Sequence, residues 1–380
     1  MTHHVTHHVT HHSMTLRCVT AHPVTVRAEP SDKFEVHGLS DAAAREARVR
    51  VHSALSRLEG LKTRECRVRV TVSGANGSCP AADLAVAVAA LDVMGVLGES
   101  APKPLLLGEF ALDGRLRPVR GLYVMLREHA RAWQRTRVGQ DFADPLAVVP
   151  ECQVDEAAAV HEEYVSWFAA RDLHQVVLWF QSQLSPVPFR PWCVQTIAAD
   201  PLPLPDLSKL GAAILLVGPP GTGKLGLARA IAANLPAPSL LVGEEIVTTY
   251  SAAGLWQRDL RVPFRAPHHT VSEAGLLGGG SHVRPGEVSL AHGGCLLLDE
   301  VAEFRREALR QLALAVRDGE VCVARSDAVV RMPAKPALII GTCEPRDFER
   351  ARALYPWTGV YEVTSGEVER LTEQKEKEHA

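Results

Sequence analysis

The segment of this sequence best suited to chemistry is a glycine-rich run that follows an apolar pattern and precedes a helical one. Its glycines let the backbone curl, so that successive N–H groups and a helix N-terminus point at phosphate groups. A lysine at the end adds a positive charge on the β- and γ-phosphate oxygens. The candidate ligand-binding residues are Gly218, Pro219, Pro220, Gly221, Thr222, Gly223, Lys224 and Leu225. The spacing predicts a site for ATP, and the alternative is a glycine-rich turn that binds nothing.

The last position of this run departs from the usual pattern. A Ser or Thr normally follows the lysine, and its hydroxyl coordinates Mg²⁺; here the residue is Leu225. Changes in the groups that support a metal ligand cost about 10- to 100-fold in metal affinity or activity. We therefore expect nucleotide binding to survive, with weaker Mg²⁺ dependence and slower hydrolysis.

Two acids end a second apolar run, CLLLDE, at residues 295 to 300. Asp299 is the predicted Mg²⁺ ligand, directly or through water, and Glu300 is the predicted group that polarises the attacking water. Both are candidate catalytic residues, and the alternative is a buried strand that ends in two solvated acids. On the next predicted strand, Glu344 occupies the place where an Asn or Thr usually orients that water. A carboxylate beside a triphosphate is electrostatically unfavourable.

The elements that must position these residues form the second half of the chain. Apolar strands are predicted at 212 to 218, 295 to 300 and 337 to 341 with helices between them, which is typical of an α/β domain with a parallel sheet over 208–345. A proline-rich linker is predicted at 185–207. The Arg/Glu-rich segment 346–380 is predicted to be a charged, solvated tail.

The first half predicts a mixed α and β domain over 14–184. Its signals are an amphipathic helix that begins at Ser40 or Asp41, an alternating strand from Cys66 to Val72, a nearly wholly buried helix from Ala82 to Met94, and a hairpin turn at Asp113-Gly114. Residues 1–13 are predicted to be a His-rich tail, with Met14 as the expected start.

Composition narrows the function classes. The chain has 380 residues with 41 basic and 44 acidic side chains, a net charge of −3, so no overall basic field draws it onto nucleic acid or anionic lipid. The eight cysteines show no close pairing and are expected to be free thiols in a reducing cytoplasm. The longest apolar run, 80 to 97, contains two acids and predicts no membrane span.

Two groups of motifs resemble a known family. The segments YSAAGL and RVPFRAPHHTVSEAGLLGGGSHVRPGEVSLAHGGCLLLDEVAEFRREALRQL, within 250 to 312, resemble the Mg-chelatase-like AAA+ proteins and, among them, the ComM (YifB) family. The segments EVHGLSDAAAREARVRVHSAL and LLLGEFALDGRLRPVRGL resemble the Lon-protease-like domain of that family. The resemblance covers roughly residues 20 to 345.

The resemblance implies a Lon-protease-like α+β domain followed by a P-loop AAA+ domain that usually forms hexameric rings and, in ComM, drives branch migration of DNA. It equates Gly218 to Lys224 with the Walker A loop and Asp299 and Glu300 with the Walker B pair. For His268-His269 and for GEVSLAHGG at 286 to 294 it implies structural or inter-subunit roles, and a metal site at the histidine pair is the alternative.

Departures from the family pattern weaken the expected activity. The sequence ends before the family's helical lid, which carries a sensor arginine and an arginine finger, and losing such a cation costs about 10³ to 10⁵ in rate. Arg346, Arg350 and Arg352 are possible substitutes, although a charged surface explains them as well.

The peptidase chemistry of the Lon-like domain is also missing its residues. Ala81 stands where its nucleophilic Ser belongs, with Ser78 three residues early, and Tyr123 stands where its Lys base belongs. Cys79 lacks an identifiable base. We therefore predict no peptidase activity.

Three functions remain open. The first is an ATP- and Mg²⁺-binding protein with weak or no hydrolysis. The second is an active DNA-remodelling ATPase in a ring, with His282 and Arg284 of the loop 275 to 287 facing the DNA. The third is a structural or interaction protein without nucleotide. The net charge favours a chain that associates weakly and binds DNA poorly at physiological salt.

Overall fold

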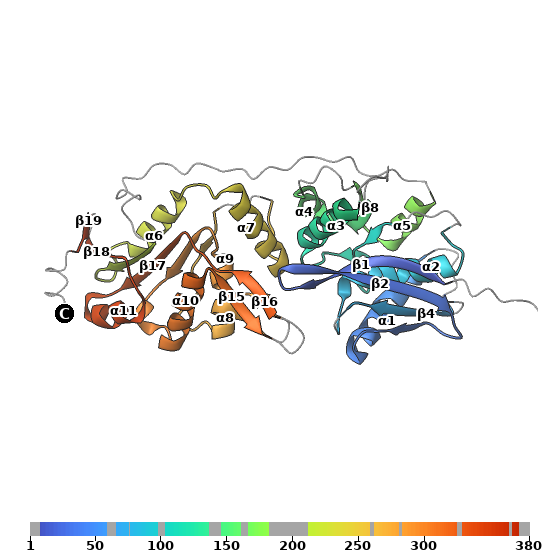
Figure 1. Cartoon of the computed structure of the whole chain (residues 1–380), viewed down its shortest axis with the longest axis horizontal. Helices are drawn as coiled ribbons and strands as arrows, with labels where there is room; N and C mark the ends of the chain where they lie inside the picture. Colours follow the sequence, from blue (N-terminus) through green and yellow to red (C-terminus); the bar gives the residue numbers. More distant parts are fainter. Residues whose placement is uncertain are drawn as a thin grey trace, which may run out of the picture. The chain divides into compact units, whose positions relative to one another are not determined.

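In the computed structural model the chain forms two compact units (Figure 1). Unit 1 comprises Met1–Cys193 with Gly254–Arg258, and unit 2 comprises Val194–Ala253 with Asp259–Ala380. The described residues are 8–58, 66–75, 77–97, 103–136, 146–160, 166–181, 212–258, 262–280, 283–324, 329–364 and 367–371. The predicted linker at 185–207 lies outside them.

Unit 1 has an α+β architecture on a mixed sheet of order β3-β4-β2-β1-β5-β8-β9. The strands β1 to β2 and β2 to β4 pair antiparallel, and the remaining neighbours pair parallel. The strands are β1 (Val9–Arg17), β2 (Thr20–Pro30), β3 (Glu35–His37), β4 (Val68–Ser73), β5 (Leu105–Leu106), β8 (Leu146–Pro150) and β9 (Ser166–Ala170), with the separate hairpin β6 (Glu109–Phe110) and β7 (Leu116–Arg117). The helices are α1 (Asp41–Leu55), α2 (Asp83–Val93), α3 (Leu122–Thr136), α4 (Val154–Ala158) and α5 (Leu173–Phe180).

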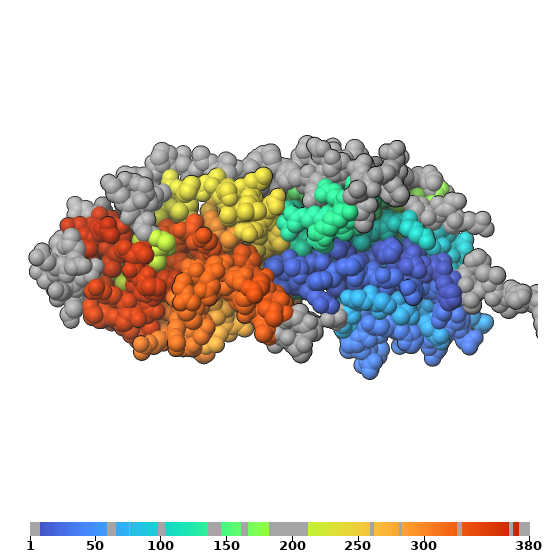
Figure 2. Space-filling view, in the orientation of Figure 1, coloured from blue at the N-terminus to red at the C-terminus, as the bar shows by residue number. Residues whose placement is uncertain are grey.

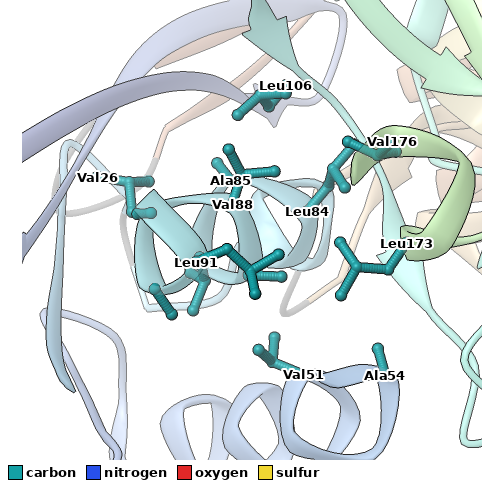
Figure 3. Close-up of a cluster of buried hydrophobic side chains, with 14 of the residues drawn as sticks. Val26, Val51, Ala54, Leu84, Ala85, Val88, Leu91, Leu106, Leu173 and Val176 are labelled. Atoms are coloured by element: carbon teal, nitrogen blue, oxygen red, sulfur yellow. The ribbon is translucent and has the colours of Figure 1, made fainter. Parts of the chain in front are cut away.

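The core of unit 1 is organised around α2. Every residue from Asp83 to Leu91 is buried, as the uniform Ala/Val/Leu sequence predicts. Figure 3 shows Ala85 and Val88 of α2 toward Leu106 of the sheet, and Leu91 toward Val51 of α1. A helix buried on all sides needs apolar partners on all sides, and here the sheet and α1 supply them in separate layers.

Asp83 is the exception among these apolar residues. Its carboxylate is 1% exposed and accepts hydrogen bonds from Arg50 Nε at 2.6 Å and Nη2 at 3.2 Å and from the Phe110 amide at 3.3 Å. Burial raises the pKa of Asp83 to about 6, and the Arg50 guanidinium opposes that rise. The carboxylate joins α1, α2 and β6, and breaking such a buried pair leaves an uncompensated charge.

The N-terminal strand differs from the predicted tail at residues 1–13. β1 begins at Val9 and pairs with β2 from Val9 opposite Ala28 onward. His11 is 1% exposed, and its Nε2 lies 2.8 Å from Asp92 Oδ2. Successive side chains of a strand point to opposite faces, so His11 and Ser13 are buried while His12 is exposed. The sequence does not reveal this strand, because histidine at both buried and exposed positions gives no alternation of apolar and polar residues.

Lowering the pH is expected to weaken unit 1 through His129 on α3. Its Nε2 is buried without a hydrogen-bond partner among the described residues, and burial, with a smaller effect of His12, lowers its pKa from 6.5 to about 4. The unfolded chain therefore binds more protons between these values, so stability falls as the pH drops below about 6.5, by about 2 kcal/mol at pH ~5.

Urea unfolding of wild type and His129→Phe at pH ~7.5 and pH ~5 tests this. The loss on acidification is expected to be smaller in the variant. Asp83, with its raised pKa, shifts stability in the opposite direction in both proteins and cancels in the comparison. An identical loss in both would show that His129 is protonated freely in the folded state.

Unit 2 is an α/β unit on a sheet of order β11-β14-β17-β10-β18-β19, parallel except for the β18–β19 pair. The strands are β10 (Ala213–Val217), β11 (Phe264–Arg265), β14 (Cys295–Leu298), β17 (Leu338–Cys343), β18 (Gly359–Thr364) and β19 (Glu367–Arg370), with the hairpins β12 (Gly278–Gly279) to β13 (Arg284–Pro285) and β15 (Glu320–Ala324) to β16 (Val329–Pro333). The helices are α6 (Lys224–Ala233), α7 (Leu240–Ala253), α8 (Glu273–Leu277), α9 (Glu287–Leu290), α10 (Arg306–Asp318) and α11 (Phe348–Leu354). No helix in the described part of either unit is long and apolar enough to cross a membrane.

The central strands of unit 2 carry the predicted site at their carboxyl ends. β10 is buried along its whole length between β17 and β18. The helix α6, which follows β10, covers one face of the sheet through Ala228 and Ile231 (Figure 1). This packing fixes the start of α6 beside the end of β10, which is where the glycine-rich loop runs.

The sheet also extends past residue 345, where the sequence analysis placed a solvated tail. β18 pairs parallel with β10 and buries Val360, Tyr361 and Val363. The preceding α11 is rich in Arg and Glu but buries Phe348 and Ala351. Residues 346–364 and 367–371 therefore belong to unit 2 in the structure. The many charged side chains around β18 obscure the pattern of this short apolar strand in the sequence.

Candidate functional site

The glycine-rich loop takes a shape that glycines alone permit. At Gly218 a Cβ atom would lie 2.3 Å from the Val363 carbonyl oxygen of β18, so a side chain is excluded. Gly221 and Gly223 have φ angles of 81° and 83°, in the left-handed region that L-residues avoid. Both face open space, so the constraint at these two positions is the backbone conformation itself.

The loop ends at the N-terminus of α6. Gly223 is the N-cap, it has no side-chain cap, and its carbonyl accepts the Leu227 amide at 2.9 Å. The amides of the first helical turn have no carbonyl within the helix to bond to. Together with the partial positive charge of the helix end, they form a site that attracts an anion.

Lys224 lies folded over the loop. Its Nζ donates to the Gly218 carbonyl at 2.6 Å and to the Pro219 carbonyl at 2.8 Å, and Thr222 Oγ1 also donates to Pro219, at 3.0 Å. An ammonium group has three donors, so a phosphate oxygen can take the third or exchange with a carbonyl. The two carbonyls therefore hold the positive charge of Lys224 beside the glycine-rich loop.

Leu225 is 37% exposed on the first turn of α6. Its side chain has no oxygen for a metal, so the position that normally ligates Mg²⁺ contributes none here. Because it is not part of the buried core, it can be changed without a packing defect.

The loop and the acidic pair lie at the same edge of the sheet. The Gly218 amide donates to the Cys343 carbonyl at the end of β17, at 3.2 Å. The preceding residue, Thr342, donates from Oγ1 to Asp299 Oδ1 at 2.5 Å. Parallel strands of order β14-β17-β10 thus bring residues far apart in the sequence to adjacent positions.

Thr342 is a site residue that the sequence analysis did not select. It is 1% exposed, and its hydroxyl accepts the Glu300 amide at 3.0 Å while donating to Asp299. One hydroxyl therefore holds both predicted catalytic residues. The position of Thr342 at the end of an apolar strand could have indicated this role. The sequence analysis selected Glu344 instead, because its charge suggested a direct effect on a bound phosphate. The Glu344 carboxylate instead forms an ion pair with Arg346 Nε at 2.9 Å.

Glu300 combines an exposed carboxylate with a strained backbone. Its φ and ψ are 52° and 53°, a left-handed conformation that is costly for a residue with a Cβ, and its side chain is 67% exposed. The carboxylate lies 3.9 Å from His269 Nδ1, and the His269 ring contacts the His268 ring at a tilt of 36°, with ring centroids 4.0 Å apart. Within the described ranges, no group of three or more His, Cys, Asp or Glu side chains could hold a metal ion.

The three arginines considered as substitute fingers have partners within unit 2. Arg346 contacts Glu344 and Asp347, and Arg350 Nη1 lies 3.9 Å from Glu303. The Arg352 guanidinium lies 5.9 Å from the centroid of the Phe348 ring. These contacts agree with the reading of a charged surface.

The motif at 286 to 294 connects several elements of unit 2 through hydrogen bonds. Arg265 of β11 donates to both carboxylate oxygens of Glu287, at 2.6 and 2.8 Å. His292 is 5% exposed, lies 2.8 Å from Glu245 of α7, and accepts the Lys335 amide at 3.2 Å. These contacts support the structural role for the motif that the sequence analysis gave as one possibility.

Three of the four positions named for peptidase chemistry, Cys79, Ala81 and Tyr123, are buried in unit 1, whereas Ser78 is exposed. Ala81, 6% exposed, presents a methyl group, and Tyr123, 5% exposed, lies at the start of α3. Burial raises the pKa of the Cys79 thiol to about 11, so at neutral pH it is not a thiolate.

Comparison with known families gives two matches, one in each unit. Residues 209–348 match the family Mg_chelatase, described as magnesium chelatase, subunit ChlI. Residues 24–138 match the family ChlI, described as subunit ChlI of Mg-chelatase.

Individual relatives extend over both matches. An uncharacterized protein of Mycobacterium tuberculosis (strain H37Rv) is 35% identical over 338 residues, which cover 82% of this chain and 64% of the relative. Competence protein ComM of Haemophilus influenzae is 30% identical over 334 residues, covering 80% and 62%. The YifB protein of Escherichia coli is 29% identical over 347 residues, covering 84% and 65%. The chain therefore spans somewhat less than two thirds of the length of these relatives.

Proposed function

We propose, on the premise that the chain belongs to the Mg-chelatase-like ComM/YifB family, that it binds ATP with Mg²⁺ in the loop Gly218 to Leu225 and hydrolyses it slowly or not at all. The observation that carries the proposal is the contact chain from the loop through β17 to Asp299. It joins an anion site to a carboxylate, and these are the kinds of group that bind a phosphate and its metal ion.

The residues divide the binding between them. The amides of the loop and of the first turn of α6 would bind phosphate oxygens, and Lys224 would neutralise the terminal phosphates. Mg²⁺ prefers oxygen ligands, and Asp299, held by Thr342, supplies a carboxylate for it. When bound, the ion would neutralise charge on the phosphates. Glu300, exposed beside Asp299, is the group that would polarise water.

Slow hydrolysis follows from the residues at two positions. Leu225 withholds the hydroxyl that usually ligates the metal, and Glu344 replaces the amide or hydroxyl that would orient the water. The Arg346 ion pair reduces the repulsion between Glu344 and a triphosphate, but the ionised Glu344 carboxylate has no N–H or O–H to donate to a water molecule. Binding without rapid turnover is the expected outcome.

We also propose that unit 1 is a Lon-protease-like domain without peptidase activity. The compartment we propose for the protein is the cytoplasm. The matching family over 24–138 and the mixed sheet support the domain assignment. Ala81 and Tyr123 in place of a nucleophile and a base support the lack of peptidase activity.

Titration of the purified chain with a fluorescent ATP analogue, with and without Mg²⁺, tests the proposal. We expect saturable binding with weak Mg²⁺ dependence, reversed by unlabelled ATP. A lack of binding at high micromolar nucleotide would leave the structural or interaction role, in which the loop is only a turn.

An active DNA-remodelling ATPase is the second candidate, favoured by the 30% identity to a competence protein. Arg284 is exposed on the β12–β13 hairpin and is available to phosphates, whereas His282 lies outside the described residues. Light scattering with ATP and Mg²⁺, run beside a DNA mobility shift, separates the candidates. A stable ring that retards DNA only with ATP would favour remodelling, and a weakly associating chain would favour the binding protein.

A further inference from the structure

Unit 1 contains a pocket that the proposed function does not use. Its volume is about 620 Å³, within the range of about 300 to 1,000 Å³ that small-molecule sites occupy. The lining comes from the β2–β3 turn, the outer side of α1 and the entry to β4. The lining residues are Asp32, Lys33, Phe34, Arg48, Val49, His52, Ser53, Ser56, Cys66 and Arg67.

The lining is predominantly cationic. Lys33, Arg48 and Arg67 face one acid, Asp32, and His52 adds a fourth basic group when protonated. Arg48 and Arg67 are both exposed, and neither has an ion-pair or hydrogen-bond partner for its guanidinium among the residues that the structure describes. Lys33 is paired with Glu35 at 3.1 Å but remains 77% exposed. Two guanidinium groups from different elements are therefore available at one pocket.

The packing of α1 and β4 places these arginines there. α1 buries Ala47, Val51 and Leu55, which turns Arg48 and His52, one helical turn apart, to its outer side. Cys66 and Val68 are buried, so Arg67 between them points outward by strand alternation. The outer side of α1 forms part of the blue surface of unit 1 in Figure 2.

Other lining groups restrict the kind of ligand. The Ser53 hydroxyl donates to the Leu112 carbonyl and the Ser56 hydroxyl to the Ser53 carbonyl, both at 2.7 Å, so the available donors are mainly the cations. Phe34 is half-buried and Val49 is 55% exposed, which gives the pocket an apolar wall. An anion joined to a flat apolar group satisfies both kinds of surface.

We propose that this pocket binds a phosphate ester of nucleotide size, with the phosphate between Arg48 and Arg67 and the base against Phe34. Guanidinium groups suit phosphate because they donate two parallel hydrogen bonds to it. The ligand chemistry fits either a free mononucleotide or the phosphodiester of a single-stranded oligonucleotide. The site is separate from the loop Gly218 to Leu225, and the inference does not rest on ATP binding there.

Binding is measured in the full chain carrying Lys224→Ala, so that the glycine-rich loop contributes little. The probes are AMP by calorimetry and a fluorescein-labelled five-nucleotide single strand by anisotropy, each with inorganic phosphate as competitor. Arg48→Glu with Arg67→Glu is expected to weaken binding at least about 10-fold, because the variant loses the charge-assisted hydrogen bonds of both guanidinium groups and places two negative charges beside the phosphate. Arg27→Glu with Arg45→Glu, which makes the same charge change at exposed positions outside the pocket, is expected to leave affinity unchanged.

Binding of AMP, or of the oligonucleotide, that is lost in the pocket variant alone supports the proposal, and the probe that binds identifies the source of the phosphate. Equal losses in the pocket and control variants, or no binding of either probe at millimolar concentration, overturn it. The substituted arginines are exposed, so the variants are expected to unfold at the same temperature as the wild type. If the double pocket variant unfolds at a lower temperature, the single substitution Arg48→Gln replaces it in the test.

Discussion

Replacing Lys224 by alanine is expected to reduce the affinity for ATP at least about 100-fold. The ammonium group lies over the loop, 2.6 Å from the Gly218 carbonyl oxygen, so its charge sits where the terminal phosphates would bind. Charge-assisted hydrogen bonds to phosphate are about twice as strong as neutral ones, and two of them account for a loss of about 3 kcal/mol. The substitution also frees two loop carbonyls, which would then face the phosphates as acceptors.

Competition of unlabelled ATP against a fluorescent analogue measures this loss. Arg229→Ala is the matched control, because it removes an exposed cation from the same helix without touching the loop. Its affinity should equal that of the wild type. Undiminished binding by Lys224→Ala would place the nucleotide outside the glycine-rich loop.

The site was predictable where local pattern and chemistry coincide. The loop has its glycines, its lysine and flanking apolar and helical patterns in one stretch of sequence, and the structure forms β10, the left-handed turns at Gly221 and Gly223, and α6 from them. The buried helix around Leu84 was predictable for the same reason, since an uninterrupted Ala/Val/Leu pattern has no solvent face. Each of these inferences needed only neighbours in sequence.

Features that depend on distant contacts were not predictable in this way. β18 forms a strand because it pairs with β10. The residues around β18 in the sequence are charged and do not indicate this pairing. β1 includes histidines because α2 supplies Asp92 to His11. Thr342 acquires its role only when β17 lies beside β14 and its hydroxyl meets Asp299. In all three cases the residue types are ordinary, and their contacts depend on the packing of elements that are distant in the sequence.

Thr342 also shows how the site is coupled to the sheet. Glu300 has a left-handed backbone, and the hydrogen bond from its amide to the Thr342 hydroxyl helps to hold that conformation. The same hydroxyl fixes Asp299, and the next carbonyl along β17 binds the loop. A group binding at the loop is therefore connected to both acids through two consecutive residues of one strand. In the proposed nucleotide site, the loop and both acids would therefore stay connected although Leu225 provides no metal ligand.

Introducing that ligand by Leu225→Thr is expected to raise the affinity for Mg²⁺-ATP by about 10- to 100-fold, the range over which supporting metal contacts act. Leu225 is 37% exposed, so its replacement removes little packing. Mg²⁺-dependent titration of the fluorescent analogue measures the gain, and Leu225→Ala is the control, because it removes the leucine without adding a hydroxyl. Equal affinities for the Thr and Ala variants would mean that the metal does not approach this position.

The gain in affinity should precede any gain in turnover, because Glu344 still occupies the water-orienting place in Leu225→Thr. Phosphate release by Leu225→Thr should therefore stay near background, and adding Glu344→Asn should raise it, since an amide can both donate to and accept from water. Glu300→Gln in that double variant should remove the increase, because it lacks the carboxylate that we propose polarises the attacking water. If the unmodified chain already turns over rapidly and loses this in Glu300→Gln, then Leu225 and Glu344 do not limit catalysis, and the remodelling ATPase becomes the better description.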